Sequence, residues 1–145
     1  YSDFLEGAKE GLKTVKGLIP VLIGLMTAVG VLRASGFLDF LGEILGKVTS
    51  AAGIPPQIVP LGIVRLFSSS AATGLLLDIF KEFGTDSPVG LMAGLMLSST
   101  ESVFYCMSVY FGSVGIQKTR YTLTGALVAT LAGMAASVWI VTCVM

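Results

Sequence analysis

The C-terminal segment, residues 121–145, contains no charged side chain. As an α-helix it would measure about 37 Å, enough to cross the roughly 30 Å hydrocarbon core of a bilayer with some tilt. A second uncharged run lies between Lys16 and Arg33 and is interrupted by Pro20, which membrane helices tolerate. The two runs predict membrane spans over 121–145 and 17–36.

The composition of the whole chain also favours lipid as its solvent. Of its 145 residues, 54% are hydrophobic and 12% are charged, whereas an average soluble domain carries roughly 25% charged residues. So few charged side chains could not cover the water-exposed surface of a soluble domain. The alternative is a subunit that is buried inside a large soluble complex. The length predicts a single domain, residues 1–145.

Several function classes lack their usual chemistry in this sequence. The net charge is zero, so there is no surplus of basic side chains to neutralise a nucleic acid. Histidine, the commonest general base and metal ligand, is absent. Cys106 and Cys143 lie in apolar runs and are expected to be small buried hydrophobes, although a soft-metal site with Cys106 and Met107 is the alternative. We predict no enzyme, no cofactor, no metal site and no nucleic-acid partner.

Two segments place apolar and charged side chains on opposite faces of a helix. They predict amphipathic helices over 1–16 and 37–52, lying in the plane of the membrane interface. For the first helix, the alternative is a solvated helix that caps the bundle. The apolar stripes are Phe4, Leu5, Ala8, Leu12 and Val15 in the first helix, and Phe37, Leu41, Ile44, Leu45 and Val48 in the second.

The stretch after Pro55 and Pro56 predicts a re-entrant helical hairpin over 56–84. Its two apolar arms meet at a cluster of three serines, and each has about a dozen residues, or roughly 18 Å of helix. That length reaches the middle of a bilayer but does not cross it. The segment 87–117 repeats the pattern loosely, because one apolar run ends at a Ser-Ser-Thr-Glu cluster and another follows. It predicts a span that is broken near its centre.

Two charged residues are expected near the middle of the membrane, Arg65 before the hairpin tip and Glu101 at the break. An unpaired charge there costs on the order of 2.5–3.5 kcal/mol. We therefore expect both to face one polar cavity and to pair there, directly or through water or solute. The alternative is an ion pair that only fixes packing. The candidate solute-binding residues are Arg65, Ser68, Ser69, Ser70, Ser98, Ser99, Thr100 and Glu101.

Serine positions in these two segments suggest where helices begin. Ser98 and Glu101 have the spacing of a capping box, which predicts a helix that starts near Ser99. Ser70 is expected to cap the second arm of the hairpin. Two helix N-termini would then point into the mid-membrane cavity, and their unpaired N–H groups suit an anionic or carbonyl-bearing solute.

Several runs of the sequence carry a resemblance to one known family. They are 32–39 (LRASGFLD), Pro60–Arg65 with the serine cluster that follows, 99–105 (STESVFY), 109–116 (VYFGSVGI) and 118–121 (KTRY). Together these runs resemble the family of bacterial spore maturation protein B. The family carries a gate or nucleoside-recognition domain, shared with concentrative nucleoside transporters and ferrous-iron transporters. The resemblance implies a polytopic protein of the bacterial cytoplasmic membrane. It also implies a membrane partner similar to spore maturation protein A, and a link to dehydration of the spore core.

The predicted protein is an all-α, polytopic membrane domain with about three spans, a re-entrant hairpin and two interfacial helices. Basic residues indicate its orientation, since five lie on the side of the N-terminus and three on the other. This predicts a cytoplasmic N-terminus. The chain begins at Tyr1, so a few upstream residues are expected, and no cleavable signal is predicted.

The leading functional hypothesis is one half of a transporter or channel for a small polar or anionic solute. The chain is short for enclosing a pathway alone, so we expect a membrane partner or a homo-oligomer. The rival hypothesis is a membrane scaffold of the spore envelope that transports nothing.

Overall fold

The computed structural model describes residues 1–49 and 53–145, and its regular elements there are all helical. The all-α class is therefore confirmed. The predicted end of the second amphipathic helix, residues 50–52, lies outside the described residues. The elements are α1 (Ser2–Ala34), α2 (Phe37–Thr49), the short 3-10 helix η2 (Pro56–Ile58), α3 (Val59–Phe67), α4 (Ser69–Phe83), α5 (Pro88–Ser99), α6 (Val103–Ser113) and α7 (Thr122–Val144).

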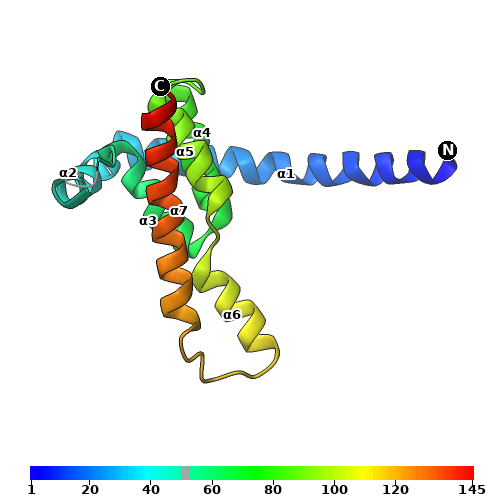
Figure 1. Cartoon of the computed structure of the whole chain (residues 1–145). Helices are drawn as coiled ribbons and strands as arrows, with labels where there is room; N and C mark the ends of the chain where they lie inside the picture. The colour runs from blue at the N-terminus through cyan, green and yellow to red at the C-terminus, as the bar shows by residue number, and fades with distance from the viewer. Residues whose placement is uncertain (50–52) are drawn as a thin grey trace.

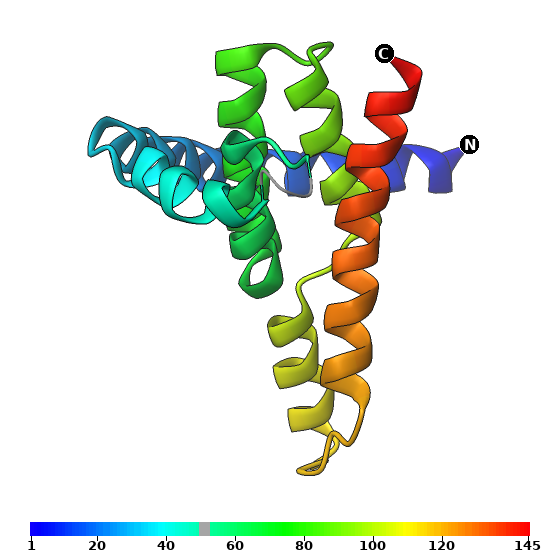
Figure 2. The same ribbon diagram turned by 60° about the vertical axis from the view of Figure 1, so that its left-hand side comes forward.

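The centre of the molecule is formed by α3, α4, α5 and α7 (Figures 1 and 2). The hairpin of α3 and α4 packs against α5, and α7 runs along the other side of α5. Most core side chains come from these helices and from η2, and Val29 of α1 and Leu38 of α2 join them. They include Ile58, Leu61, Ala72, Leu75, Ile79, Met92, Ala93, Met96 and Val138.

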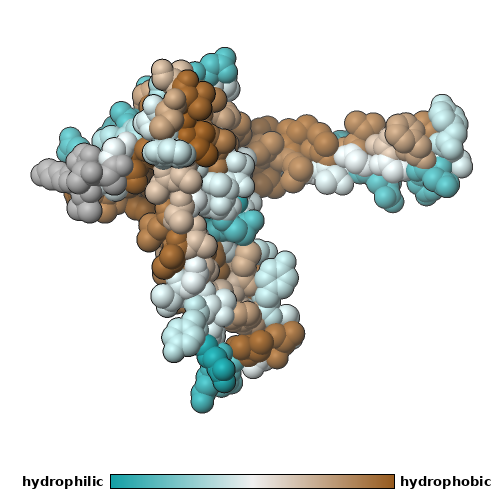
Figure 3. All heavy atoms as spheres, in the orientation of Figure 1, coloured by the Kyte–Doolittle hydropathy of each residue, from teal (hydrophilic) through white to brown (hydrophobic). Residues whose placement is uncertain are grey.

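Among the residues that the structure describes, three helical segments are long and apolar enough to cross a membrane. They are α1, the continuous stretch Pro88–Ser113 that contains α5 and α6, and α7. Figure 3 shows apolar surface along much of α7 and along the half of α1 nearest the bundle, and hydrophilic surface at the tip of the loop after α6. The prediction of about three spanning helices agrees with these candidates.

The first two predicted segments form one helix, so the predicted boundary between residues 16 and 17 is wrong. The helix α1 continues through Pro20, although this residue cannot donate a hydrogen bond to the carbonyl of Lys16. Nearly all of its length is exposed, and Val29 is its buried residue. In both ribbon views α1 runs crosswise to α7, and it meets the bundle near its C-terminal end (Figures 1 and 2).

The packing face of α2 differs in part from the predicted apolar stripe. Phe37 and Ile44 belong to the predicted stripe, yet both are about half exposed. Gly42 and Gly46 are buried instead, and a Cβ atom on Gly46 would lie 3.2 Å from Cβ of Pro56. The two glycines therefore let η2 approach the backbone of α2 closely, which rotates the contact away from the larger side chains.

The helix α1 packs closely against α4 at Gly74, and an ion pair also joins the two helices. A Cβ atom on Gly74 would lie 3.3 Å from Cβ of Leu25 and 3.4 Å from Cγ2 of Val29. Further along, Nε of Arg33 donates to Oδ2 of Asp78 over 2.7 Å, and Nη2 of Arg33 is 2.5 Å from the same oxygen. Sequence analysis did not pair Arg33 with Asp78.

We expect Gly74→Leu to lower the stability of the protein by about 1–3 kcal/mol, because a larger side chain would overpack the contact between α1 and α4. Gly24→Leu is the matched control, since nothing lies within 4 Å of a Cβ atom at that position of α1. Unfolding in detergent micelles, followed by circular dichroism, measures both. Equal stability of the two variants would contradict the packing described here.

Candidate functional site

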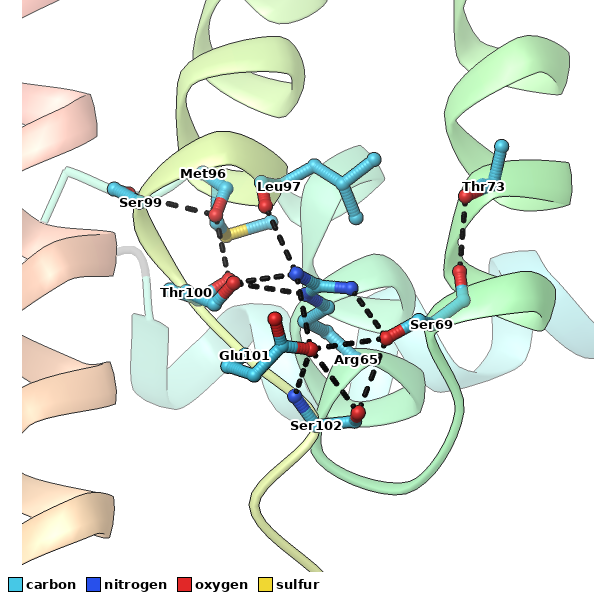
Figure 4. Close-up of polar contacts among 9 residues, drawn as sticks. All are labelled: Arg65, Ser69, Thr73, Met96, Leu97, Ser99, Thr100, Glu101 and Ser102. Carbon is cyan, nitrogen blue, oxygen red and sulfur yellow. Dashed lines mark hydrogen bonds and ion pairs between the residues drawn. The ribbon is translucent and has the colours of Figure 1, made fainter. Parts of the chain in front are cut away.

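The hairpin tip and the break between α5 and α6 lie side by side (Figure 4). The chain turns at Ser68, whose backbone is extended with φ −148° and ψ 114°. The break covers residues 100–102, between the end of α5 and the start of α6. The hydrogen bonds that join the two turns involve Arg65, Ser69, Thr100, Glu101 and Ser102.

Arg65 reaches from α3 to the C-terminal end of α5. Its Nε and Nη2 both donate to the carbonyl oxygen of Thr100, and Nη2 also donates to the carbonyl oxygen of Leu97 over 3.2 Å. Its Nη1 donates to Oγ of Ser69 over 2.8 Å. Only 8% of the Arg65 surface is exposed, so these protein groups surround the guanidinium.

Glu101 concentrates its contacts on one carboxylate oxygen, Oε1. This atom accepts hydrogen bonds from the backbone N–H of Ser102 at 2.9 Å, the hydroxyl of Ser102 at 3.1 Å and the hydroxyl of Ser69 at 3.1 Å. Nη2 of Arg65 lies 3.5 Å from the same oxygen. The predicted pairing of Arg65 with Glu101 is therefore present, but it is a long contact within a wider network.

The two charges match the ends of the helices they touch. Arg65 places positive charge at the C-terminus of α5, where carbonyl groups lack helical partners. Glu101 places negative charge at the first residue of α4 and at the N-cap of α6. Each helix end thus meets its preferred charge from within the chain. Both helix N-termini therefore already lie beside a carboxylate of the chain, and the predicted anionic solute stays a prediction.

A cavity of about 450 Å³ opens beside the break. Two-thirds of the Glu101 side chain is exposed there, although Arg65 is buried. In the described part of the chain no hydrogen bond reaches Oε2 of Glu101, so this oxygen can accept one from a solute or water. The lining residues are Ser98, Ser99, Thr100, Glu101, Val103, Ala126, Ala129 and Thr130.

The structure brings six of the eight predicted site residues together at the break and places the other two at the start of α4. Arg65, Ser69, Thr100 and Glu101 share one network, and Ser98 and Ser99 line the cavity beside it. Ser68 instead caps α4, and Ser70 is exposed on the first turn of that helix. Whether any of these residues binds a solute stays a prediction.

Both predicted helix caps are wrong. Ser98 lies in the last turn of α5, where its hydroxyl donates to the carbonyl oxygen of Leu95, so it caps no helix. The helix after the break starts at Val103. In the hairpin, the helix cap is Ser68, two residues before the predicted Ser70. Its Oγ accepts a hydrogen bond from the N–H of Ala71. The spacing was misleading because serine in a final helical turn can bond to the preceding carbonyl as well as begin a new helix.

Sequence analysis missed two residues of this region. Ser102 is 1% exposed, and both its hydroxyl and its N–H bind Glu101. The position of Ser102 directly after Glu101 is the sequence signal that could have indicated its role. Ser137 of α7 lies 3.1 Å, hydroxyl to hydroxyl, from Ser99, and nothing in its local sequence indicated this partner.

The two cysteines contribute no ligand cluster to the region. Cys106 is half-buried, whereas Cys143 is exposed, so the expectation that both are buried is wrong for Cys143. Among residues 1–49 and 53–145, no group of three or more His, Cys, Asp or Glu side chains is arranged to hold a metal ion.

A helical hairpin that meets a broken, membrane-length helix at paired charges defines a gate-type membrane domain. The chain belongs to the Gate family, described as nucleoside recognition, whose model matches residues 15–117. Spore maturation protein B of Bacillus subtilis (strain 168) is 43% identical over 142 residues, which cover 98% of this chain and 80% of the relative. The chain is thus a homologue of that protein, and the predicted family is confirmed. No solved structure matches the chain significantly.

We expect Arg65→Lys to destabilise the protein by about 2 kcal/mol or more, because a charge-assisted hydrogen bond contributes roughly 1.5–3 kcal/mol. A single ammonium group cannot reach the carbonyls of Thr100 and Leu97 and the hydroxyl of Ser69 together. Arg120→Lys, at an exposed position, is the control. Denaturant unfolding in micelles compares the two, and an unchanged midpoint for Arg65→Lys would contradict the capping role.

Proposed function

We propose that this chain is one half of a membrane transporter or channel for a small polar solute. The observation that carries the proposal is the uneven use of the Glu101 carboxylate. Three hydrogen bonds hold Oε1, whereas Oε2 receives none from the described part of the chain, and Glu101 lines a cavity of about 450 Å³. A side chain held this firmly with one acceptor left over is suited to bind a hydrogen-bond donor of the solute.

The arrangement favours a neutral or cationic solute over an anionic one. The cavity offers a carboxylate oxygen and hydroxyl groups, whereas the guanidinium of Arg65 is buried and used by the protein. An anion would face the Glu101 charge without a cation available to offset it. Because the family is described by nucleoside recognition, nucleosides are the first solutes to test. The name of the bacterial relative, spore maturation protein B, supports a role of this chain in sporulation.

A partner chain is part of the proposal. A compact folded chain of 15.1 kDa exposes about 7,100 Å² by the usual scaling with mass, whereas this chain exposes 9463 Å². Most of α1 contributes to the excess, since it touches the bundle only near its C-terminal end. A homo-oligomer or a membrane partner similar to spore maturation protein A would cover this surface and complete the pathway.

The rival function, a scaffold without transport, has one observation in its favour. The contacts of Arg65 with Thr100, Leu97 and Ser69 are those of a residue that fixes packing. They account for the arginine but leave Oε2 of Glu101 unexplained. The two functions therefore differ most sharply at Glu101.

We expect Glu101→Gln to reduce solute flux at least ten-fold while membrane insertion stays normal, because the amide keeps the shape of the side chain and removes its charge. Uptake of radiolabelled uridine and adenosine into sealed vesicles measures this, with and without the co-expressed partner. Glu6→Gln, on the exposed part of α1, is the control. Equal flux for wild type and Glu101→Gln would contradict the site, and no flux from any correctly inserted form would favour the scaffold.

A cytoplasmic N-terminus predicts which loops face the cell exterior. The loop between α4 and α5 should lie outside, and the loop before α7 should lie inside with Lys118 and Arg120. In a background with Cys106→Ser and Cys143→Ser, we expect a membrane-impermeant maleimide to label Thr85→Cys in intact cells. It should label Lys118→Cys only after permeabilisation. The opposite pattern would invert the topology.

A further inference from the structure

The cavity beside Glu101 has a second wall that belongs to α7. Three of its lining residues come from this helix, namely Ala126, Ala129 and Thr130. Thr130 turns its hydroxyl back to the carbonyl oxygen of Ala126, so this wall offers the cavity mainly methyl groups. It therefore faces the carboxylate and hydroxyl groups of the break with a small, apolar surface.

The position of this wall is set by close contacts between α7 and the end of α5. A Cβ atom on Gly133 would lie 3.0 Å from the carbonyl oxygen of Ser99 and 3.4 Å from Cγ2 of Thr100. One turn further, the hydroxyl of Ser137 lies 3.1 Å from that of Ser99. Backbone contact at Gly133 brings α7 as near to the break as it can come. The width of the cavity is therefore determined by the side chains that α7 carries just before Gly133.

We infer that Ala126 and Ala129 set the size of the solute that binds at Glu101. The solute class is then one that donates hydrogen bonds to Oε2 of Glu101 on one side and turns an apolar edge or ring face to α7 on the other. Larger side chains at these two positions would fill the space opposite the carboxylate. The inference rests on the proposed function, because it concerns the same cavity.

The first test measures the cavity without needing to know the solute. In the background with Cys106→Ser and Cys143→Ser, Ser98→Cys places a thiol on the cavity lining across from α7. Its reaction rate is measured with two cationic methanethiosulfonates, one carrying an ammonium group and one carrying the bulkier trimethylammonium group. We expect Ala129→Leu to slow the bulkier reagent at least ten-fold and the smaller reagent less than three-fold.

Ala135→Leu is the matched control, because Ala135 lies on an exposed position of α7 away from the cavity lining. It should change neither rate by more than about two-fold. Should Ala129→Leu slow neither reagent, or should Ala135→Leu slow both as strongly, the α7 wall would not limit the cavity and the inference would fail. Proper folding of each variant is checked by its elution as a single species in detergent.

The second test uses flux and separates this inference from the proposed function. We expect Ala129→Leu to reduce uptake of adenosine and uridine at least ten-fold and uptake of ribose less than three-fold. If flux requires Glu101 but Ala129→Leu transports all three like Ala135→Leu, the size-setting role is wrong and the transport function stands. If flux does not require Glu101, the proposed function fails, and the thiol measurement alone decides whether α7 limits the cavity.

Discussion

The guanidinium of Arg65 holds the site together. It binds carbonyl groups at the end of α5 from a position inside α3, and it also binds the hydroxyl of Ser69 at the start of α4. Three helix ends thus converge on one buried side chain. A helix that stops within the low-dielectric interior leaves carbonyl groups without partners, and burying them unpaired would cost several kcal/mol in lipid. Arg65 supplies the missing donors, so the break can exist where it does.

Glu101 completes this arrangement from the opposite direction. Its Oε1 receives the N–H at the start of α6 and the hydroxyl at the start of α4, and the contact with Arg65 balances the charge. The same residues that satisfy the broken backbone therefore also leave one carboxylate oxygen beside the cavity. In the proposed function, Oε1 of Glu101 satisfies the broken backbone and Oε2 would bind the solute. An ion pair that fixes packing and the proposed solute site are therefore compatible at one position.

The helical class, the hairpin, the broken segment and the pairing of Arg65 with Glu101 followed from the sequence, because long apolar runs and rare charges leave few alternatives in lipid. The helix caps did not, since Ser98 and Ser70 have local spacings that suit more than one hydrogen bond. The hydrogen-bond partners of Asp78 and Ser99 could not be predicted from the sequence either. Arg33 and Ser137 lie 45 and 38 residues away from them, and such contacts depend on how the helices pack. The packing face of α2 was missed because glycine approaches η2 more closely than its apolar neighbours.

The attachment of α1 has a consequence for the order of biosynthesis. Arg33 leaves the ribosome 45 residues before its partner Asp78. During that interval α1 is complete, with an apolar second half that ends in a cation, and α4 is not yet there to pack against it. Gly74, the other anchor point, is synthesised only a few residues before Asp78. The helix therefore docks on α4 late, when α4 emerges, and before that the partner already synthesised is α2, which also contacts α1 in the folded chain.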